Sequence, residues 1–363
     1  MNVKSFFLLV KRMILFFFFV SLHLVKLGRM NKKEAISWMN EMGRTERPFL
    51  FAINYTTTDC RVWPLEQVPD DHVGYQIGSN TNIEKLSSPT ALSDLLPSLA
   101  QQASPILSSA PESAESYHRR FRIVRNNLLL GNSYLVNLTS RIPIRSSLSL
   151  KDLFLLSKAK YKLWLKDEFV CFSPETFLQI HQGEISCCPM KGTIRADDEG
   201  SLQSLMADPK EAAEHATIVD LIRNDLSMVA NEVRVEHYRY GERLHTDHGD
   251  LWQTSSRITG RLPNNYRCHL GDILFSQLPA GSITGAPKPK TMEIIQAAEP
   301  FDRGFYTGVM GLYQNGDLDS AVMIRFIDLE DGQLYFKAGG GITTRSDWKK
   351  EYEEVIEKIY VPR

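Results

Sequence analysis

Apolar residues recur along the chain with helical spacing in some segments. From Tyr117 to Leu130 they fall at intervals of three and four residues, which predicts a helix that ends at Gly131-Asn132. A longer helix is expected from Asp208, which can cap it, with Pro209 in its first turn. Its expected buried stripe comprises Ala212, Ala216, Val219, Ile222, Leu226 and Val229. A last helix is expected from near Ser346, with a buried face made by Tyr352, Val355, Ile356 and Ile359.

Short apolar runs bounded by turn residues predict strands between these helices. We expect strands at 47–56 and 134–138, a series of strands over 169–194, and three strand–turn units over 303–342. Residues 86–112 are rich in Ser, Pro and Leu and indicate a loop and a short helix. Because helices and strands mix without a regular β-α-β alternation, the pattern favours an α+β fold over a doubly wound sheet.

The start of the chain differs from the rest. Two apolar runs, 6–10 and 13–20, are separated by Lys11 and Arg12, and each is shorter than the roughly 20 residues that a membrane-spanning helix needs. No A-x-A-like cleavage site follows them. We therefore expect residues 1–29 to be an apolar leader that precedes the true start at Met30, and we consider a membrane tether the weaker alternative.

Charge and cysteine content narrow the class of protein. The 363 residues carry 42 Lys and Arg against 43 Asp and Glu, so there is no basic excess to neutralise nucleic-acid phosphates. The five cysteines are odd in number and include no C-x-x-C pair, which favours unpaired thiols over disulfides or a zinc site. These features predict a cytoplasmic protein that does not bind nucleic acid.

Two residues are candidates for catalysis. Lys191, in PMKGT, follows a cysteine-containing apolar strand and precedes a Gly-Thr turn, and in a dry site its amine would be a nucleophile. Glu175, in SPE, lies at a turn between two expected strands, where it could act as a general acid. For each residue taken alone, a solvated surface side chain is the competing interpretation.

Paired glutamates and glycine-rich turns could bind ions. Glu211 and Glu214 are three residues apart on one expected helix, and Glu351 and Glu354 repeat this spacing on another. Side by side, the two helices would present four carboxylates, which suit Mg²⁺, although two solvated helix faces are the alternative. The glycine-containing segments 281–288 and 339–341 match neither a phosphate loop nor a dinucleotide fingerprint. The three consecutive glycines at 339–341 could still let backbone N–H groups approach an anion.

Taken in order, several segments resemble the chorismate-utilising enzyme family, which includes anthranilate synthase component I, aminodeoxychorismate synthase component I, and the isochorismate and salicylate synthases. These segments are SPETFL (173–178), PMKGTIRA (189–196), EHATIVDLIRNDLSMVA (214–230), AGSITGAPKPKTMEII (280–295), RGFYTGVMGLY (303–313), AVMIRF (321–326) and AGGGITTRSDWKKEYEE (338–354). The resemblance implies a layered α+β sandwich with large antiparallel sheets at its centre, flanked by helices. It also implies a short N-terminal portion at 30–110 and a chorismate-binding catalytic domain at 111–363.

The resemblance favours aminodeoxychorismate synthase component I over anthranilate synthase component I, because Lys191 stands where the latter usually has alanine. It implies that Lys191 attacks C2 of chorismate while Glu175 protonates the departing C4 hydroxyl. Ammonia then adds at C4 and expels the lysine. The product would be 4-amino-4-deoxychorismate, a precursor of 4-aminobenzoate and folate.

Further roles are implied by position. Glu214 and Glu354 match Mg²⁺ ligands, with Glu211 and Glu351 as their companions. Arg325 matches the residue that binds a substrate carboxylate. Other matched substrate contacts are Gly192, Thr193, Tyr306, Gly339, Gly341 and, less directly, Lys288.

The chain also departs from the family pattern. Gln253 stands where many relatives have histidine, which removes an acid–base group. Leu135 stands where relatives have glutamine and where water-adding members have lysine, and this counts against water as the nucleophile. No cysteine lies in a G-x-C-x-G context, so the implied partner is a separate glutamine amidotransferase subunit that supplies ammonia. A non-catalytic relative that only binds a glutaminase is the remaining alternative.

Overall fold

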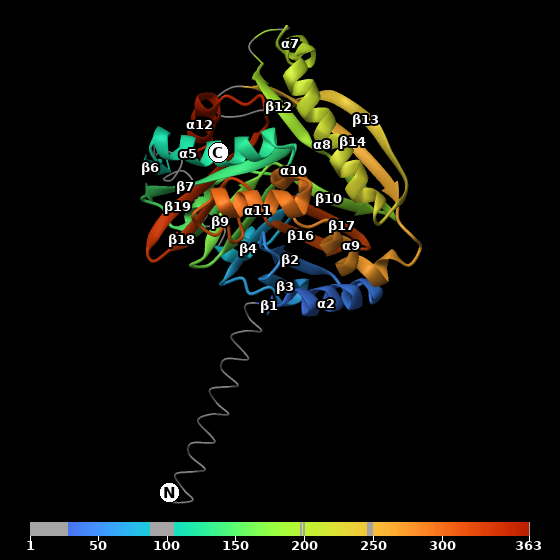
Figure 1. Cartoon of the computed structure of the whole chain (residues 1–363). Helices are drawn as coiled ribbons and strands as arrows, with labels where there is room; N and C mark the ends of the chain where they lie inside the picture. The colour runs from blue at the N-terminus through green and yellow to red at the C-terminus, as the bar shows by residue number, and fades with distance from the viewer. Residues whose placement is uncertain (1–27, 88–104, 197, 199, 245–249, 363) are drawn as a thin grey trace, which may run out of the picture.

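The computed structural model describes residues 28–87, 105–196, 198, 200–244 and 250–362. Two large antiparallel sheets lie at the centre of this part of the chain, and helices cover their outer faces (Figure 1). The predicted α+β class with central antiparallel sheets is confirmed.

The first sheet contains ten strands in the described residues. Its order is β1-β3-β2-β16-β17-β10-β11-β14-β12, and β13 also pairs with β14. The strands are β1 (Arg29–Met30), β2 (Phe49–Ile53), β3 (Cys60–Pro64), β10 (Thr176–His181), β11 (Glu184–Cys187), β12 (Met190–Arg195), β13 (Asn231–Leu244), β14 (Leu251–Arg261), β16 (Val309–Gln314) and β17 (Asp317–Val322). Hairpins join neighbours in sequence, whereas β2–β16 and β10–β17 join segments far apart in the chain.

The second sheet contains nine strands in the described part. Its order is β15-β7-β19-β18-β9-β8-β4-β5, and β6 pairs with β7. The strands are β4 (Val73–Ile77), β5 (Asn80–Thr81), β6 (Ile106–Ser109), β7 (Leu135–Ser146), β8 (Tyr161–Leu165), β9 (Phe169–Ser173), β15 (Gly285–Ala286), β18 (Phe326–Glu330) and β19 (Gln333–Ile342). Strands from residues 29–81 therefore enter both sheets.

Helices pack on these sheets. They are α2 (Lys32–Arg44), α3 (Ile83–Leu86), α5 (Ala114–Leu129), α6 (Leu150–Leu156), α7 (Ser201–Ala207), α8 (Pro209–Ser227), α9 (Leu270–Ser276), α10 (Gly281–Thr284), α11 (Lys288–Ala298) and α12 (Trp348–Glu357), with 3₁₀ turns at Leu65–Gln67 and Tyr266–His269. Helix α8 lies along β12, β13 and β14, and α5 and α11 lie together over β7 (Figure 1). The Asp208 side chain caps α8 as expected, by accepting a hydrogen bond from the Glu211 N–H at 3.1 Å.

Some sequence predictions need correction. On α8, Val219, Ile222 and Leu226 are buried as expected, but Ala216 is exposed and His215 is fully buried instead. The segment 303–342 holds four strands rather than three units. Of the expected loop and short helix at 86–112, residues 88–104 lie outside the described residues, and 106–109 form a strand on β7. Ile359 lies beyond the end of α12.

The apolar leader lies outside the described residues as far as position 27. Arg29 and Met30 form β1, and Arg29 makes an ion pair of 2.6 Å with Asp59, so the boundary expected after residue 29 falls inside a strand. Among the described residues, no helix has both the length and the apolar character needed to cross a membrane.

Two of the points at which the chain passes between the sheets lie next to each other. Residues 174–175 lead from β9 in the second sheet to β10 in the first, and residues 323–325 lead from β17 back to β18. The two crossings are hydrogen-bonded to each other: the Val322 N–H donates to the Glu175 carbonyl, and the Phe172 N–H donates to the Arg325 carbonyl, each at 3.1 Å. Glu175 and Arg325 are therefore neighbours where the sheets meet.

Candidate active site

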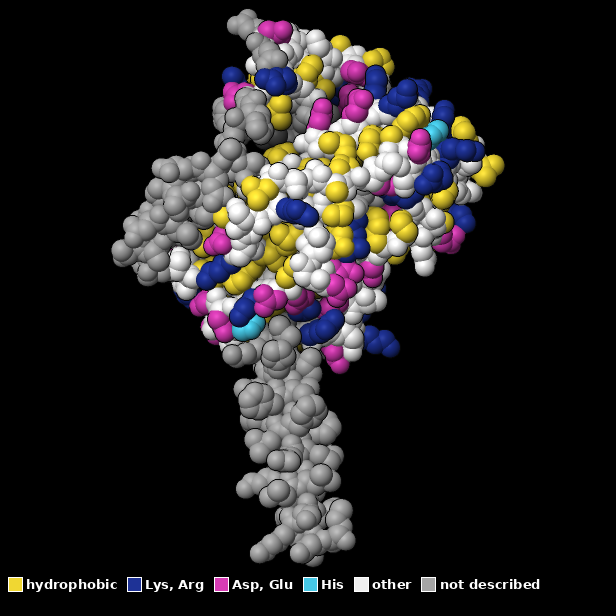
Figure 2. Space-filling view, turned by 90° about the vertical axis from the view of Figure 1, so that its left-hand side faces the viewer, with side chains coloured by type: hydrophobic (Ala, Val, Ile, Leu, Met, Phe, Trp, Pro, Cys, Tyr) yellow, Lys and Arg dark blue, Asp and Glu magenta, His cyan; other side chains and the backbone are white. Residues whose placement is uncertain are grey.

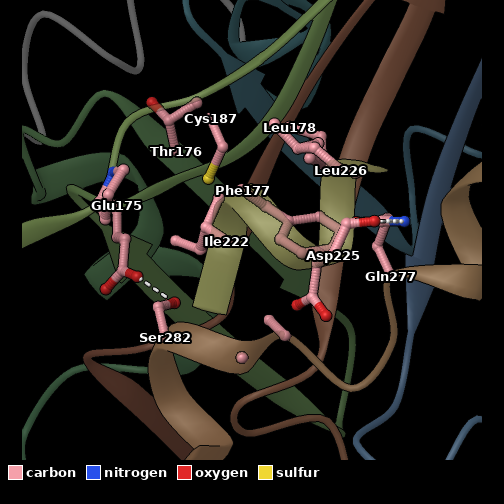
Figure 3. Close-up of a pocket in the computed structure, with 13 residues that line it drawn as sticks. Glu175, Thr176, Phe177, Leu178, Cys187, Ile222, Asp225, Leu226, Gln277 and Ser282 are labelled. Carbon is pink, nitrogen blue, oxygen red and sulfur yellow. Dashed lines mark hydrogen bonds between the residues drawn. The ribbon is translucent and has the colours of Figure 1, made fainter. Parts of the chain in front are cut away.

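Glu175 is held by a tight turn at the first crossing. The Ser173 hydroxyl accepts a hydrogen bond from the Glu175 N–H at 3.1 Å, and Ser282 Oγ donates to Glu175 Oε1 at 2.7 Å (Figure 3). Burial raises the pKa of the Glu175 carboxyl, although the Ser282 hydrogen bond and the charges of Lys191 and Arg325 oppose this effect. A carboxyl that holds its proton above the usual range suits a general acid.

Lys191 projects from β12 toward β19. The pairing of β12 with β14 shifts register between Lys191 and Thr193, and Gly192 in this bulge has a φ of +73°, which favours glycine. The Thr254 hydroxyl donates to the Lys191 carbonyl and fixes the strand there. A β-carbon placed on Gly341 would lie 3.5 Å from Lys191 Nζ, so the amine lies against the glycine strand.

The predicted carboxylates flank Lys191. A β-carbon placed on Gly192 would lie 2.7 Å from Glu211 Oε2, and one placed on Gly340 would lie 3.3 Å from Glu351 Oε2. Gly192 adjoins Lys191 on β12, and Gly340 adjoins Gly341, which the Lys191 amine approaches, so α8 and α12 bring carboxylates to the two strands that meet near the amine.

Arg325 supplies an unpaired donor. Its φ is +51°, its guanidinium carbon lies 5.2 Å from the centre of the Tyr360 ring, and its buried Nε has no hydrogen-bond partner within the described residues. A buried donor of this kind suits an anionic ligand. The predicted contact Tyr306 is buried nearby, and burial raises the pKa of its phenol to about 12, so it remains a neutral hydrogen-bonding group.

Lys358 belongs to the same cluster, although the sequence analysis did not identify it. Its Nζ donates to the Gly339 carbonyl at 2.9 Å and pairs with Glu354 Oε1 at 2.6 Å. Burial, together with the charges of Arg325 and Lys191, lowers the pKa of its amine, and Glu354 opposes that effect. Its position four residues after Glu354 on one helix face was the available signal.

A pocket of about 200 Å³ opens beside these groups. Its lining residues are Tyr134, Leu135, Ala213, Glu214, Thr217, Thr343, Thr344 and Arg345. A β-carbon on Gly341 would lie 3.1 Å from Leu135 Cδ1, so Leu135 connects the pocket wall with the surroundings of Lys191. The pocket thus brings Glu214 and an apolar wall next to the candidate nucleophile.

Other predicted residues lie apart from this cluster. Lys288 Nζ forms an ion pair of 2.8 Å with Asp225 and donates to the Gln277 carbonyl at 2.9 Å, so its amine is already engaged. Thr193 is exposed on β12, opposite Gln253 of β14. The direct contact of Lys288 with a substrate stays a prediction.

The four glutamates do not form a metal cage here. No group of three or more His, Cys, Asp or Glu side chains converges in the described part of the chain, and Glu354 is paired with Lys358. Glu211 lies beside Gly192 of β12 and Glu351 beside Gly340 of β19, and the binding of Mg²⁺ by the four glutamates stays a prediction. Glu214 lines the pocket, and the predicted donors are all carboxylate oxygens, which fits a hard cation that keeps waters and binds a substrate oxygen.

Several known proteins are similar to this chain in sequence or in fold. A protein called "Uncharacterized PabA-like protein" from Haemophilus influenzae is 43% identical over 327 residues, which are 90% of this chain and 96% of that protein. Aminodeoxychorismate synthase component 1 from Klebsiella aerogenes is 37% identical over 68% of this chain, and the match spans 57% of that enzyme. The structure of the menaquinone-specific isochorismate synthase from Escherichia coli superposes with a TM-score of 0.66 at 15% identity, covering 91% of this chain and 82% of that one.

The family model for chorismate binding enzymes matches residues 71–362. The match includes both sheet crossings, β12, α8, β19 and α12, and so the elements that position Glu175, Lys191, Arg325 and Lys358. The chain belongs to the chorismate binding enzyme family.

Proposed function

We propose that this protein is the chorismate-aminating subunit of an aminodeoxychorismate synthase. It converts chorismate and ammonia to 4-amino-4-deoxychorismate and water, a step toward 4-aminobenzoate and folate. The observation that carries the proposal is the position of Lys191. Its amine lies against Gly341 and close enough to the Glu175 carboxyl for its charge to lower the pKa of that group.

The proposed reaction has two stages. Lys191 forms a bond to C2 while the ring double bonds shift and the C4–O bond breaks, and Glu175 gives its proton to the departing hydroxyl, which leaves as water. Ammonia then forms a bond to C4, the double bonds shift back and the C2–N bond to Lys191 breaks. One proton from the incoming nitrogen returns to Glu175, so the acid is ready for the next turnover.

Positive groups around Lys191 are proposed to bind the two substrate carboxylates. The unpaired Arg325 Nε and the Lys358 amine are suited to anions, and Leu135 shields one side of the reacting carbons from water. An apolar side chain at 135 also leaves no base there to activate water, which favours amination over hydration.

Mg²⁺ is the proposed cofactor. Glu214 and Glu354 are the proposed ligands, with Glu211 and Glu351 beside them. When bound, the ion would neutralise negative charge on the substrate and orient one carboxylate.

A glutamine amidotransferase subunit is the proposed source of ammonia. The relative from Haemophilus influenzae bears a PabA-like name. Three of the five cysteines, Cys60, Cys171 and Cys187, lack a nucleophile's surroundings, because they are buried and burial raises the pKa of each of these thiols. All five cysteines are free thiols, which supports the proposal of a reducing, cytoplasmic location.

Product analysis tests this function. The purified chain is incubated with chorismate, Mg²⁺ and ammonium at mildly alkaline pH, and the products are identified by mass spectrometry. We expect aminodeoxychorismate from the wild type and from Lys33→Ala, an exposed control lysine, and loss of that product in Lys191→Ala. Intact-mass analysis should also detect a chorismate-derived adduct that is absent from Lys191→Ala.

Other products would overturn the assignment. Anthranilate would indicate the anthranilate synthase reaction, for which a relative 32% identical over 68% of this chain is named. If no product forms with ammonium or with an added glutaminase subunit, the chain is a non-catalytic relative.

A further inference from the structure

A second, smaller cavity lies next to Glu175. It has a volume of about 20 Å³ and lies between β10, β11, α8 and α10. Because one water-sized molecule needs roughly 10–15 Å³ of such volume, the cavity holds one small molecule and excludes chorismate and glutamine. Figure 3 shows Glu175 and Ser282 on one side of it and Asp225 and Gln277 on the other, with Ile222 between them in this view.

One end of the cavity lies near the reacting centre and the other lies near the protein surface. At one end, the Glu175 carboxyl accepts from Ser282 and lies in the field of Lys191 and Arg325, so this end adjoins the proposed site of C4–O cleavage. At the other end, Asp225 pairs with Lys288 at 2.8 Å, and both side chains keep about 15% of their surface exposed, namely 16% and 15%. The cavity therefore runs from the reacting centre to an ion pair close to the protein surface.

The lining is rich in acceptors and poor in available donors. Carboxylates of Glu175 and Asp225 face the cavity, whereas the Gln277 amide donates to the Asp225 carbonyl and the Ser276 hydroxyl, both at 3.0 Å. Between the ends the wall is apolar and includes Phe177, Leu178 and Leu226, which are buried. A neutral molecule with one heavy atom and several N–H donors fits the size and the acceptors of this lining.

We propose that this cavity is the ammonia site of the enzyme, from which the nucleophile reaches C4 after the hydroxyl has left. The inference rests on the proposed amination. It gives Lys288 a new role: with Asp225, it closes the outer end of the ammonia site instead of contacting chorismate. Gly281 supports this arrangement, because a β-carbon there would lie 2.8 Å from Leu221 Cδ2 and 3.1 Å from Asp225 Oδ2.

The size of the nucleophile provides the test. Ammonium and methylammonium are compared as nitrogen sources for the full chain with chorismate and Mg²⁺, and the amino and N-methylamino products are quantified by mass spectrometry. Ile222→Ala enlarges the cavity, whereas Ile218→Ala removes the same atoms from the buried face of the same helix without lining the cavity. Ile222→Val is the milder variant, and it keeps the comparison possible should the alanine variant not fold.

We expect Ile222→Ala to raise the ratio of kcat/KM for methylammonium to that for ammonium at least 10-fold, with a smaller rise in Ile222→Val. Ile218→Ala should leave this ratio unchanged, because a general packing defect slows both nucleophiles alike. Gly281→Ala should narrow the cavity and raise the KM for ammonium several-fold without changing the KM for chorismate.

Two negative outcomes are distinct. If the wild type aminates chorismate but the ratio is the same in all variants, or rises equally in Ile218→Ala, the cavity is a structural water site and the inference is wrong. If the wild type forms no aminated product from either nitrogen source, the proposed function itself fails, and the inference with it.

Discussion

At the scale of single residues, Glu175 gives the sharpest prediction. Replacing it by glutamine should slow amination by about 10²–10⁴-fold, the usual contribution of a general acid.

The pH dependence of the rate gives a second prediction for Glu175. Because burial raises the pKa of Glu175, the carboxyl keeps its proton to higher pH than an exposed glutamate, and activity should decline as the pH rises through that pKa. Ser282→Ala removes a hydrogen bond that lowers this pKa, so the decline should move to higher pH in a pH–rate profile.

The raised pKa of Glu175 also predicts how the free energy of unfolding depends on pH, independently of catalysis. A carboxyl whose folded pKa exceeds its unfolded value contributes stability that is fully present below the unfolded pKa and is lost as the pH rises through the folded pKa. The unfolding free energy of Glu175→Gln, relative to wild type, should therefore increase from about pH 4.5 upward. A difference that falls with pH would show that Glu175 is not a buried acid.

Gly192 tests how the Lys191 bulge is held. Alanine there meets both a φ of +73° and the Glu211 carboxylate, whereas alanine at Gly332 meets a φ of +78° with no other atom within 4 Å. Backbone strain should cost each variant about 1–2 kcal/mol in urea unfolding. Only Gly192→Ala should lose more than this and also lose activity, and equal losses in both variants would contradict the proposed contact.

Sequence reasoning at this scale depended on motifs. Lys191, Glu175 and Arg325 were identified because their flanking residues match a family pattern, and the structure places them in one electrostatic neighbourhood. Ser282 and Asp225 were missed, because their importance arises from a fold that brings α10 to α8 and not from any local spacing. Lys288 lies in a matching motif, yet its ion pair could be seen only in three dimensions.

At the scale of elements, a buried ion pair joins the end of α11 to β7. Glu299 and Arg303 pair at 2.6 Å with 2% exposure each, Glu299 accepts from the Thr139 N–H, and Arg303 donates to the Asn137 carbonyl. Breaking a buried pair from one side leaves a charge without compensation. We expect Glu299→Gln to lower the free energy of unfolding by about 3–5 kcal/mol in chemical denaturation.

The same helix offers a control for this prediction. Glu293 pairs with Lys290 at 2.6 Å on the exposed face of α11, so Glu293→Gln should cost less than about 1 kcal/mol. Adding Arg303→Met to Glu299→Gln should restore part of the lost stability. A loss of the same size in both single variants would mean that the buried pair does not hold α11 to β7.

Some elements were predictable from local patterns, but their long-range pairing was not, and the long strands β13 and β14 received no prediction. The alternation of apolar runs and turn residues over 169–194 predicted β9 to β12, because the signals for a hairpin lie within a short stretch of sequence. The pairing of β10 with β17 and of β2 with β16 leaves no such signal, because each partner is only a buried apolar run that many other strands could accept. The burial of His215 on α8 likewise depends on a distant segment, because its Nε2 meets Ser256 Oγ at 2.6 Å.

At the scale of the whole molecule, the site exists because two sheets meet. The crossings at 174–175 and 323–325 place an acid and an arginine side by side, while β12 of one sheet brings Lys191 to β19 of the other. Helices α8 and α12, which are separated by more than a hundred residues of sequence, then bring Glu211 to β12 and Glu351 to β19. No single segment carries the chemistry, and only the complete fold assembles it.

Metal binding tests this assembly across the molecule. If Glu214 and Glu354 share Mg²⁺ with chorismate, adding both ligands should raise the unfolding temperature, by the equivalent of about 2.7 kcal/mol at 100 times the dissociation constant. Glu354→Gln should lose most of this gain, whereas Glu353→Gln, its exposed neighbour on α12, should retain it.

The ion pair between Glu354 and Lys358 gives a second test. Because the two side chains pair at 2.6 Å, Mg²⁺ must displace the Lys358 ammonium from Glu354. In calorimetry, Lys358→Met should therefore bind Mg²⁺ alone more tightly and chorismate less tightly than the wild type. If Glu353→Gln loses the gain as fully as Glu354→Gln, or if Lys358→Met leaves the Mg²⁺ affinity unchanged, the ion does not bridge α8 and α12, and the carboxylates there serve only to hold the lysines in place.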